Sequence, residues 1–238
     1  MSFDRIIRND ICISQPDKGF RFGLDSCILA WFASVKRKDA LLEIGAGSGV
    51  VSVLLAKLKG VRKIISVELQ EGLYSHLLET VELNGLKQVI APIHADIRGY
   101  KPNVLIDFII ANPPYRKSKS GFISEDAAKR SARFDDDLSL EDIFAFAFKN
   151  LRFGGKLAFS GVAERLTDAL AVSRKYNLEP KRLQLLYSSD RKGGKLFFLE
   201  NVYGGKAGLK ILPPLWPPDK NNPDETCPYN LILQGDWS

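Results

Sequence analysis

The sequence predicts an α/β fold built on a seven-stranded, mostly parallel sheet with an antiparallel hairpin at one edge. From residue 40 onward, strand-like apolar runs alternate with segments whose apolar residues recur every three or four positions. This alternation is typical of βαβ units, in which a helix connects two parallel strands. The last two strand-like runs are joined only by SSDRKGGK, residues 188–195. No convincing helix fits there, so these two strands should form a hairpin.

The individual elements follow from the same patterns. We expect strands in the apolar runs 40–47, 63–69, 89–97, 105–113, 156–162, 182–188 and 196–203. Between them, apolar spacing predicts helices in VVSVLLAKLK (50–59), EGLYSHLLETVELN (71–84), SLEDIFAFAFKNL (139–151) and ERLTDALAVSRKY (164–176). Ser139, followed by Glu141 and Asp142, is a good helix N-terminus, and Gly154 with Gly155 is a good stop.

The length of the chain fits one domain. With 238 residues and 45% hydrophobic content, the chain can bury a substantial core. We expect a single domain over residues 1–212, in which residues 1–38 form an N-terminal segment. Residues 213–238 contain many prolines and few periodic apolar positions, so we expect an irregular C-terminal tail.

Composition argues against several classes of protein. The three cysteines are far apart, no CxxC pair occurs, and no histidines have metal-ligand spacing, so we expect neither a disulfide framework nor a metal site. No leader-like start and no membrane-length apolar run is present. We therefore expect a soluble, cytoplasmic protein with no membrane contact, acting as a monomer.

The charge of the chain favours a polyanionic partner without proving one. The formal net charge is +6 and the pI is about 9.1. Basic residues cluster at 35–38, 115–119, 128–133 and 189–195. An ordinary soluble protein that happens to be basic remains the alternative on charge alone.

A glycine turn points to a nucleoside-containing cofactor. EIGAGSG, residues 43–49, follows a predicted strand and opens a predicted helix, so that Gly45, Gly47 and Gly49 would let a ligand approach bare backbone. The spacing is neither that of the dinucleotide fingerprint nor that of a P-loop. Glu68 ends the next strand, where a carboxylate can accept hydrogen bonds from ribose hydroxyls. The alternative for Glu68 is a solvated residue at a strand end.

Asp96 and Asn112 end two further predicted strands at the same edge of the sheet. Ligands of open α/β sheets bind outside the carboxyl ends of the strands. Asp96 could accept a hydrogen bond from an adenine amino group, or could instead cap the loop before Arg98.

The strand IIANPPY, residues 109–115, ends in residues suited to a planar amine. The exocyclic amine of adenine, like a glutamine amide, is a poor nucleophile because its lone pair is delocalised. The side-chain oxygen of Asn112 and the carbonyl of Pro113 can hold both N–H groups and turn the lone pair toward an electrophile. Pro113 and Pro114 stiffen this geometry, and Tyr115 offers a face on which a base can stack. A proline-rich structural turn would explain the prolines but not the flanking residues.

EIGAGSG, Glu68, HADI and NPPY, in this order and spacing, resemble the class I S-adenosylmethionine-dependent methyltransferases, in the NPPY branch that methylates planar amino groups. QPDKGFRFGLDSCILAWF (15–32), SARFDDDLSLEDIF (131–144) and GGKAGLKILPPL (204–215) are similar, more narrowly, to the bacterial tRNA1(Val) (adenine-N6)-methyltransferases. The resemblance covers residues from about 10 to 213. It implies a Rossmann-like class I methyltransferase fold, S-adenosylmethionine as cofactor, and methylation of the tRNA adenine next to the anticodon.

The resemblance also implies roles for individual residues. Asn112, Pro113, Pro114 and Tyr115 would receive the target base. The cofactor would contact the residues Phe22, Asp25, Glu43, Gly45, Gly47, Gly49, Glu68, Leu69, Asp96, Ile97 and Asn112. Asp25 could instead be only the N-cap of the helix SCILAWF. Arg116, Lys117, Lys119 and Arg130 would contact RNA phosphates, although solvated loop charge is the alternative for each.

Two features depart from the family. Phe134 stands where the family usually has a histidine, so no role of that histidine is transferred, and the ending after LPP differs from the family's short acidic tail. Other acceptors also remain open: a guanine or adenine of rRNA, an adenine of DNA, or a release-factor glutamine. A noncatalytic RNA-binding protein is an alternative of another class.

Overall fold

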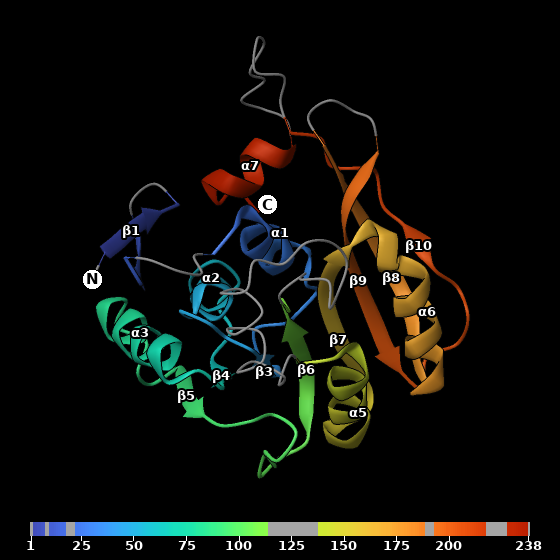
Figure 1. The fold of residues 1–238 in the computed structure, drawn as a ribbon, viewed down its shortest axis with the longest axis horizontal. Helices are drawn as coiled ribbons and strands as arrows, with labels where there is room; N and C mark the ends of the chain where they lie inside the picture. Colours follow the sequence, from blue (N-terminus) through green and yellow to red (C-terminus); the bar gives the residue numbers. More distant parts are fainter. Residues whose placement is uncertain are drawn as a thin grey trace, which may run out of the picture.

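The structure is a computed structural model that describes residues 2–7, 10–17, 22–113, 138–188, 193–217 and 228–237. Figure 1 shows an α/β fold with one large twisted sheet. The strands of this sheet are β3 (Ala40–Ile44), β4 (Lys63–Glu68), β5 (Ile90–His94), β6 (Ile106–Ala111), β7 (Leu151–Val162), β8 (Leu178–Tyr187), β9 (Gly194–Tyr203) and β10 (Lys210–Ile211). The helices are α1 (Leu24–Phe32), α2 (Val50–Leu58), α3 (Glu71–Leu83), α5 (Leu140–Asn150), α6 (Leu166–Lys175) and α7 (Pro228–Gln234), with the short 3₁₀ helix η1 (Ala163–Arg165).

The topology confirms the predicted fold class. The strand order is β10-β8-β9-β7-β6-β3-β4-β5. The neighbours from β7 through β5 pair in parallel, whereas β9 is antiparallel to both β7 and β8. All seven expected strands are present, and the predicted hairpin is the β8–β9 pair. The additional edge strand β10 contains two residues and runs parallel to β8.

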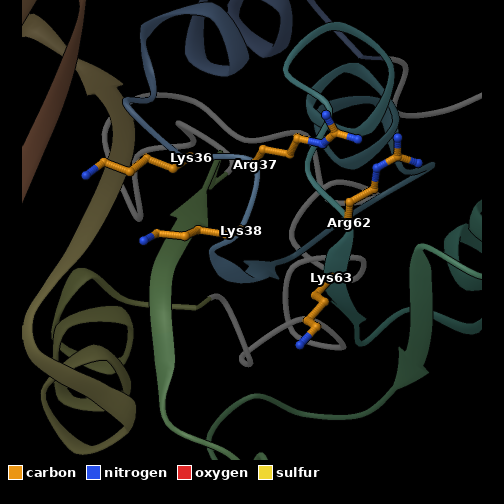
Figure 2. Close-up of a pocket in the computed structure, with 5 residues that line it drawn as sticks. All are labelled: Lys36, Arg37, Lys38, Arg62 and Lys63. Carbon is orange, nitrogen blue, oxygen red and sulfur yellow. The ribbon is translucent and has the colours of Figure 1, made fainter.

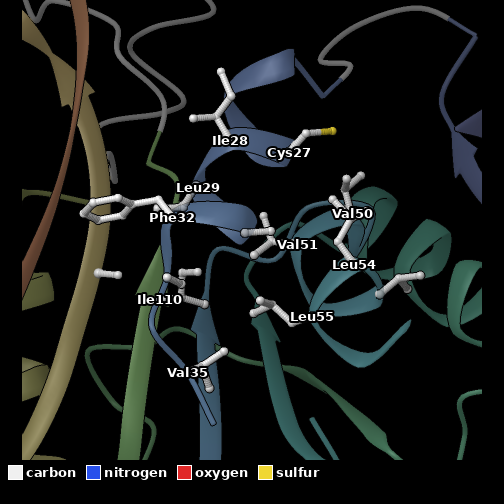
Figure 3. Packing of buried hydrophobic residues seen from close by; sticks show 14 of the residues in the cluster. Cys27, Ile28, Leu29, Phe32, Val35, Val50, Val51, Leu54, Leu55 and Ile110 are labelled. Atoms are coloured by element: carbon white, nitrogen blue, oxygen red, sulfur yellow. The ribbon is translucent and has the colours of Figure 1, made fainter. Parts of the chain in front are cut away.

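The sheet separates two apolar cores. Because successive side chains of a strand point to opposite faces, Leu41 packs in one core and Leu42 in the other. The first core contains side chains of α1, α2, α3 and α7, and the second contains those of α5 and α6. Figure 3 shows α1 packed against α2 through fully apolar contacts. Helices therefore cover both faces, which leaves the strand ends as the places where polar residues gather.

Helix α5 has the N-terminus that the sequence predicts. Ser139 is its N-cap, and its side chain accepts a hydrogen bond from the backbone N–H of Asp142, whose carboxylate accepts in return from the Ser139 N–H. The predicted glycine stop is wrong, because the helix ends at Asn150 and β7 begins at once. Gly154 and Gly155 lie inside this strand, where the pairing with β6 is irregular.

Three further elements were not expected. The N-terminal segment contains a separate antiparallel pair, β1 (Ser2–Ile6) and β2 (Ile11–Gln15). The expected irregular tail contains α7, and Tyr229 and Ile232 of this helix are buried in the first core. Figure 1 shows α7 beside α1. A short amphipathic run, with apolar residues three apart, therefore orders part of the proline-rich segment.

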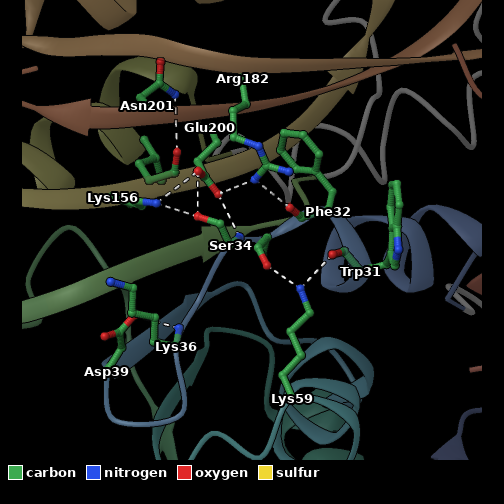
Figure 4. A network of polar contacts seen from close by, with 12 residues as sticks. Trp31, Phe32, Ser34, Lys36, Asp39, Lys59, Lys156, Arg182, Glu200 and Asn201 are labelled. Carbon is green, nitrogen blue, oxygen red and sulfur yellow. Dashed lines mark hydrogen bonds and ion pairs between the residues drawn. The ribbon is translucent and has the colours of Figure 1, made fainter. Parts of the chain in front are cut away.

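A buried polar cluster fixes the C-terminal end of α1 (Figure 4). Glu200 of β9 is 1% exposed, and its carboxylate accepts hydrogen bonds from the Ser34 N–H at 2.8 Å and the Ser34 hydroxyl at 2.7 Å. Arg182 donates to Glu200 at 3.2 Å and to the Phe32 carbonyl at 3.0 Å, and Lys156 lies 3.4 Å from the Glu200 carboxylate. This group, which we call the Glu200 cluster, ties α1 to the antiparallel part of the sheet.

Lys59 lies next to the Glu200 cluster and satisfies carbonyls at the end of α1. Its ammonium donates to the carbonyls of Trp31 and Ala33. Burial, with the nearby Arg182 charge, lowers the pKa of Lys59 from 10.5 to about 8. The last carbonyls of a helix lack partners within the helix, so this lysine acts as a cap from a neighbouring element.

In the part of the chain that the structure describes, no helix is long and apolar enough to cross a membrane. The same residues contain no group of three or more His, Cys, Asp or Glu side chains arranged for a metal ion.

Candidate active site

The glycine turn between β3 and α2 has the open backbone that the sequence predicts. Gly45, Gly47 and Gly49 have φ angles of 66°, 56° and 85°, a left-handed conformation in which a side chain is strained. A Cβ atom on Gly45 or Gly47 would meet nothing within 4 Å, whereas one on Gly49 would come within 2.5 Å of Leu77. The first two glycines therefore face open space, and the third packs against α3.

Glu68, at the end of β4, faces this turn. One carboxylate oxygen accepts from the Gly47 N–H at 2.7 Å and the other from the Gln70 N–H at 2.8 Å. The side chain is only 4% exposed, so the alternative of a solvated residue at a strand end is wrong. A carboxylate oxygen can accept more than one hydrogen bond, which leaves Glu68 suited to bind hydroxyl groups.

Glu43 lies in the interior, between β3 and α2. It is 2% exposed and accepts hydrogen bonds from the backbone N–H and the hydroxyl of Ser52, in the first turn of α2. Burial raises the pKa of Glu43 from 4.5 to about 8, against the opposing effect of the Ser52 hydrogen bonds. These contacts hold the turn and α2 together, and a direct cofactor contact of Glu43 remains a prediction.

Asp96, after β5, caps its own turn. Its carboxylate accepts from the Arg98 N–H at 2.8 Å and forms an ion pair with the Arg98 guanidinium. The hydrogen bond from the Arg98 side chain holds the pKa of Asp96 below its usual value. The capping alternative therefore describes the observed contacts. The Asp96 side chain is still 38% exposed at the same sheet edge as Glu68, so the predicted adenine contact stays open.

Asn112 lies immediately after β6 at that edge, and three side chains hold its amide. Its Nδ2 donates to Asp25 at 3.1 Å and to the Ser26 hydroxyl at 3.0 Å, and its Oδ1 accepts from the hydroxyl of Ser160. Asp25 and Ser26 come from α1, and Ser160 comes from β7, which pairs with β6. We call Asn112, Asp25, Ser26 and Ser160 the Asn112 cluster. Its hydrogen bonds set which way the amide oxygen points.

Asp25 is not the N-cap of α1. The N-cap is Gly23, which makes no side-chain cap bond, and Asp25 lies in the first turn. The carboxylate instead contacts Asn112. The candidate cofactor residue from the N-terminal segment thus touches the candidate catalytic residue directly.

The other predicted site residues differ in burial, and several lie outside the described residues. Pro113 is half-buried beside Asn112, Phe22 packs against the first core, Leu69 is 45% exposed, and Ile97 is buried in the second core. The remaining predicted positions, together with Phe134, lie outside the described residues: Pro114, Tyr115, Arg116, Lys117, Lys119 and Arg130.

Sequence reasoning missed Ser26 and Ser160. Ala111 of β6 pairs with Phe159 of β7, so the next residues along the two strands are Asn112 and Ser160. Ser160 is fully buried within the apolar run LAFSGV. A lone hydroxyl near the carboxyl end of a buried strand was the available signal, but only the strand pairing shows which residue it meets.

Known proteins resemble this chain in sequence. Residues 30–132 match the family model of the TRM5/TYW2 methyltransferase domain. A curated relative, the tRNA1(Val) (adenine(37)-N6)-methyltransferase of Christiangramia forsetii, is 26% identical over 176 residues, which are 72% of each chain. The namesake from Tolumonas auensis is 30% identical over 148 residues, which are 61% of each chain.

A solved structure agrees in fold. The predicted O-methyltransferase Atu636 of Agrobacterium tumefaciens matches with a TM-score of 0.70 at 16% identity, over 89% of this chain and 96% of that one. The comparisons confirm the resemblance inferred from the motifs and the predicted class of enzyme, a methyltransferase. The chain is a Rossmann-like methyltransferase related to the tRNA1(Val) (adenine(37)-N6)-methyltransferases.

Proposed function

We propose that this protein uses S-adenosylmethionine to methylate the exocyclic amino group of an adenine in tRNA, the adenine next to the anticodon of tRNA1(Val). The observation that carries the proposal is Asn112, followed by Pro113, held by Asp25, Ser26 and Ser160 at the sheet edge where the glycine turn opens. The names of the relatives support the same substrate. We further propose that the enzyme acts as a monomer without a metal.

The residues of the turn fit the cofactor. Gly45 and Gly47 present bare backbone with no atom within 4 Å of an added Cβ, so the methionine part of the cofactor can lie directly over them. The carboxylate of Glu68 would hold the ribose hydroxyls, and the exposed carboxylate of Asp96 would accept from the adenine amine. Bound S-adenosylmethionine supplies a methyl group on a positively charged sulfur. The carbon of this methyl group is an electrophile at neutral pH.

Positioning and electrostatics would carry the transfer. The side-chain oxygen of Asn112 and the carbonyl of Pro113 would accept the two N–H groups of the target amine and direct its lone pair toward the methyl group. Both acceptors also stabilise the positive charge that develops on the nitrogen as the bond forms. No strongly basic residue is needed, because the methylated nitrogen becomes acidic enough to lose a proton to water.

The Asn112 cluster would prevent the amide from turning. An amide that rotated by half a turn would present N–H donors to an amine that also donates, which is repulsive. The Asp25 carboxylate accepts a hydrogen bond from Nδ2 and would repel Oδ1 in its place, so Asp25 favours the observed orientation, while the hydroxyls of Ser26 and Ser160 accept from Nδ2 and donate to Oδ1 in agreement with it.

The target base and its backbone would be held by the segment after Pro113. We propose that Tyr115 stacks on the adenine and that Arg116, Lys117, Lys119 and Arg130 contact phosphates. In a loop, the adenine needs only to unstack, at a cost of a few kcal/mol.

Incubation of the purified protein with radiolabelled S-adenosylmethionine and bulk tRNA from a strain that lacks the cognate gene tests this function. After digestion of the RNA, label should appear in N6-methyladenosine. No label in tRNA, with cofactor binding intact, would contradict the proposal and direct the search to rRNA or to a release-factor glutamine. Failure to bind the cofactor would favour a noncatalytic RNA-binding protein.

A further inference from the structure

Five basic side chains line one open pocket at the amino ends of β3 and β4, far from the Asn112 cluster. The pocket measures about 540 Å³ and is lined by Lys36, Arg37, Lys38, Arg62 and Lys63. We call these residues the amino-edge patch. Figure 2 shows the five side chains extending in several directions from two neighbouring segments instead of meeting at one point. Such a spread suits an extended anion better than a single small one.

The sheet brings these residues together. The segment 36–38 precedes β3, and residues 62–63 lie at the start of β4. Because β3 and β4 pair in parallel with Ala40 opposite Lys63, their two amino ends lie side by side. Three of the five residues belong to the basic cluster VKRK at 35–38, and strand pairing adds the other two charges.

The charge of the amino-edge patch is not neutralised locally. All five side chains are exposed, and within the described ranges none forms an ion pair or a side-chain hydrogen bond. The nearby carboxylates serve other groups. Asp39 accepts from the Lys36 backbone N–H at 2.8 Å, and Asp107 binds Arg152 and the Ala40 N–H. Five like charges therefore repel one another, and an anionic ligand would relieve that repulsion.

The distance between the amino-edge patch and the catalytic edge sets a minimum size for a ligand that reaches both. β3 runs from Ala40 beside the patch to Ile44 before the glycine turn. At roughly 3.3 Å per residue, the patch and the catalytic edge are on the order of 20 Å apart. A single nucleotide cannot reach both, whereas a folded RNA can.

We infer that the amino-edge patch binds the sugar–phosphate backbone of the substrate RNA, at a stretch outside the loop whose adenine reaches Asn112. The inference rests on the proposed function for the identity of that RNA. Lysine and arginine contacts to phosphates position an RNA without reading its sequence. The patch would thus add affinity and orientation, and the choice of base would stay at the Asn112 cluster.

A pair of triple variants tests this inference. In the first, Lys36, Lys38 and Lys63 are replaced by Gln. In the matched control, Lys57, Lys149 and Lys210 are replaced by Gln; these lysines are also exposed and lie on α2, α5 and β10. Both variants lose three positive charges, so the net charge changes equally.

The readout is binding of tRNA without cofactor, titrated at several salt concentrations. Each lost phosphate contact should make the slope of log K against log salt shallower by roughly 0.7 to 0.9. The patch variant should therefore lose about 2 to 3 in slope and bind tRNA at least about tenfold more weakly near 0.15 M salt. The control should stay close to wild type. Equal losses in both variants, or no loss in the patch variant, would overturn the inference.

A second substrate separates this inference from the proposed function. A short RNA that contains only the target loop should be methylated equally well by the wild type and the patch variant. An equal loss of activity on the short and the full-length RNA would overturn the placement of the patch contact outside the loop. If the wild type methylates neither RNA, the proposed function fails, while the binding titration still decides whether the patch holds RNA.

Discussion

The two ends of α1 carry polar clusters that differ in how completely the protein encloses them. At the C-terminal end, the Glu200 carboxylate is 1% exposed and accepts hydrogen bonds on both oxygens from Ser34 and from the cations around it. At the N-terminal end, Asn112 is only half-buried, and its partners fix its orientation at an open sheet edge. A cluster closed on all sides stabilises the fold, whereas one of similar chemistry at an open edge can act on a ligand.

Replacement of Asn112 by Ala should have the largest effect of the substitutions on activity. The substitution removes an acceptor aligned with the reacting amine, so the rate of methyl transfer should fall by about a thousandfold, or ~4 kcal/mol. Single-turnover transfer of labelled methyl groups to tRNA measures this. Cofactor affinity, followed by calorimetry, should stay near wild type, and complete loss of cofactor binding would contradict the assigned role.

Replacement of Glu200 by Ala should mainly lower stability and leave the activity of the folded protein nearly unchanged. It leaves Arg182 and Lys156 without their buried partner, so the free energy of unfolding should fall by about 3 kcal/mol. Urea denaturation measures this loss, and transfer activity of the folded variant should be close to that of the wild type.

Glu82→Ala is a control for Glu200→Ala, because it breaks the exposed pair of Glu82 with Lys87. It should cost no more than about 1 kcal/mol. A loss as large as that of Glu200→Ala would show that burial does not distinguish the two pairs.

Replacement of Ser160 by Ala should have a smaller effect, on activity and stability together. The Asn112 amide loses one of the contacts that orient it, so kcat should fall about tenfold while cofactor affinity is unchanged. Ser173→Ala is the matched control, since Ser173 is also fully buried and donates to the Ala169 carbonyl within α6. Both variants should lose about 1 kcal/mol of stability. If the Ser173 variant loses as much activity, the effect of Ser160 is only structural.

Replacement of Glu43 by Gln should have the smallest effect when stability is measured at pH 5. With its pKa raised to about 8, Glu43 is mostly protonated in the folded protein, and Gln has the same shape. At pH 5, where the unfolded chain still binds part of the proton, the free energy of unfolding should change by less than about 1 kcal/mol.

The free energies of unfolding of Glu43→Gln and of the wild type should diverge as the pH rises. Between the unfolded pKa near 4.5 and the folded pKa near 8, the folded wild type holds a proton that the unfolded chain has lost. Wild-type stability should therefore fall as the pH rises through this range. The variant lacks this contribution, so its stability relative to the wild type should increase with pH. Parallel stability curves from pH 5 to 9 would show that Glu43 is ionised in the folded state.

Much of the fold was predictable because its signals are local. The strand runs from 40 to 203, the hairpin, and the cap at Ser139 follow from apolar spacing and short motifs. The glycine turn and Glu68 were predictable for the same reason, since each follows directly on a strand. The short helix α7 was missed because prolines dominate the composition around it.

The contacts around the Asn112 amide were not predictable from the sequence. They depend on strand pairing and on the packing of α1 against the sheet, which no short motif encodes. The same holds for the amino-edge patch, in which Lys63 joins Lys38 only because β3 and β4 are neighbours. Asp25 and Asn112 were both predicted as site residues, but the hydrogen bond between them was not, because they lie 87 residues apart in the chain.

The Asn112 cluster also has a consequence for how the chain becomes active during its synthesis. Its hydrogen bonds join positions 86 and 87 residues apart on one side and 48 on the other. The orienting contacts therefore cannot be complete until β7 has been made and has paired with β6. A nascent chain or a proteolytic fragment that ends before Ser160 would contain the glycine turn, Glu68 and Asn112, and still lack a fixed amide.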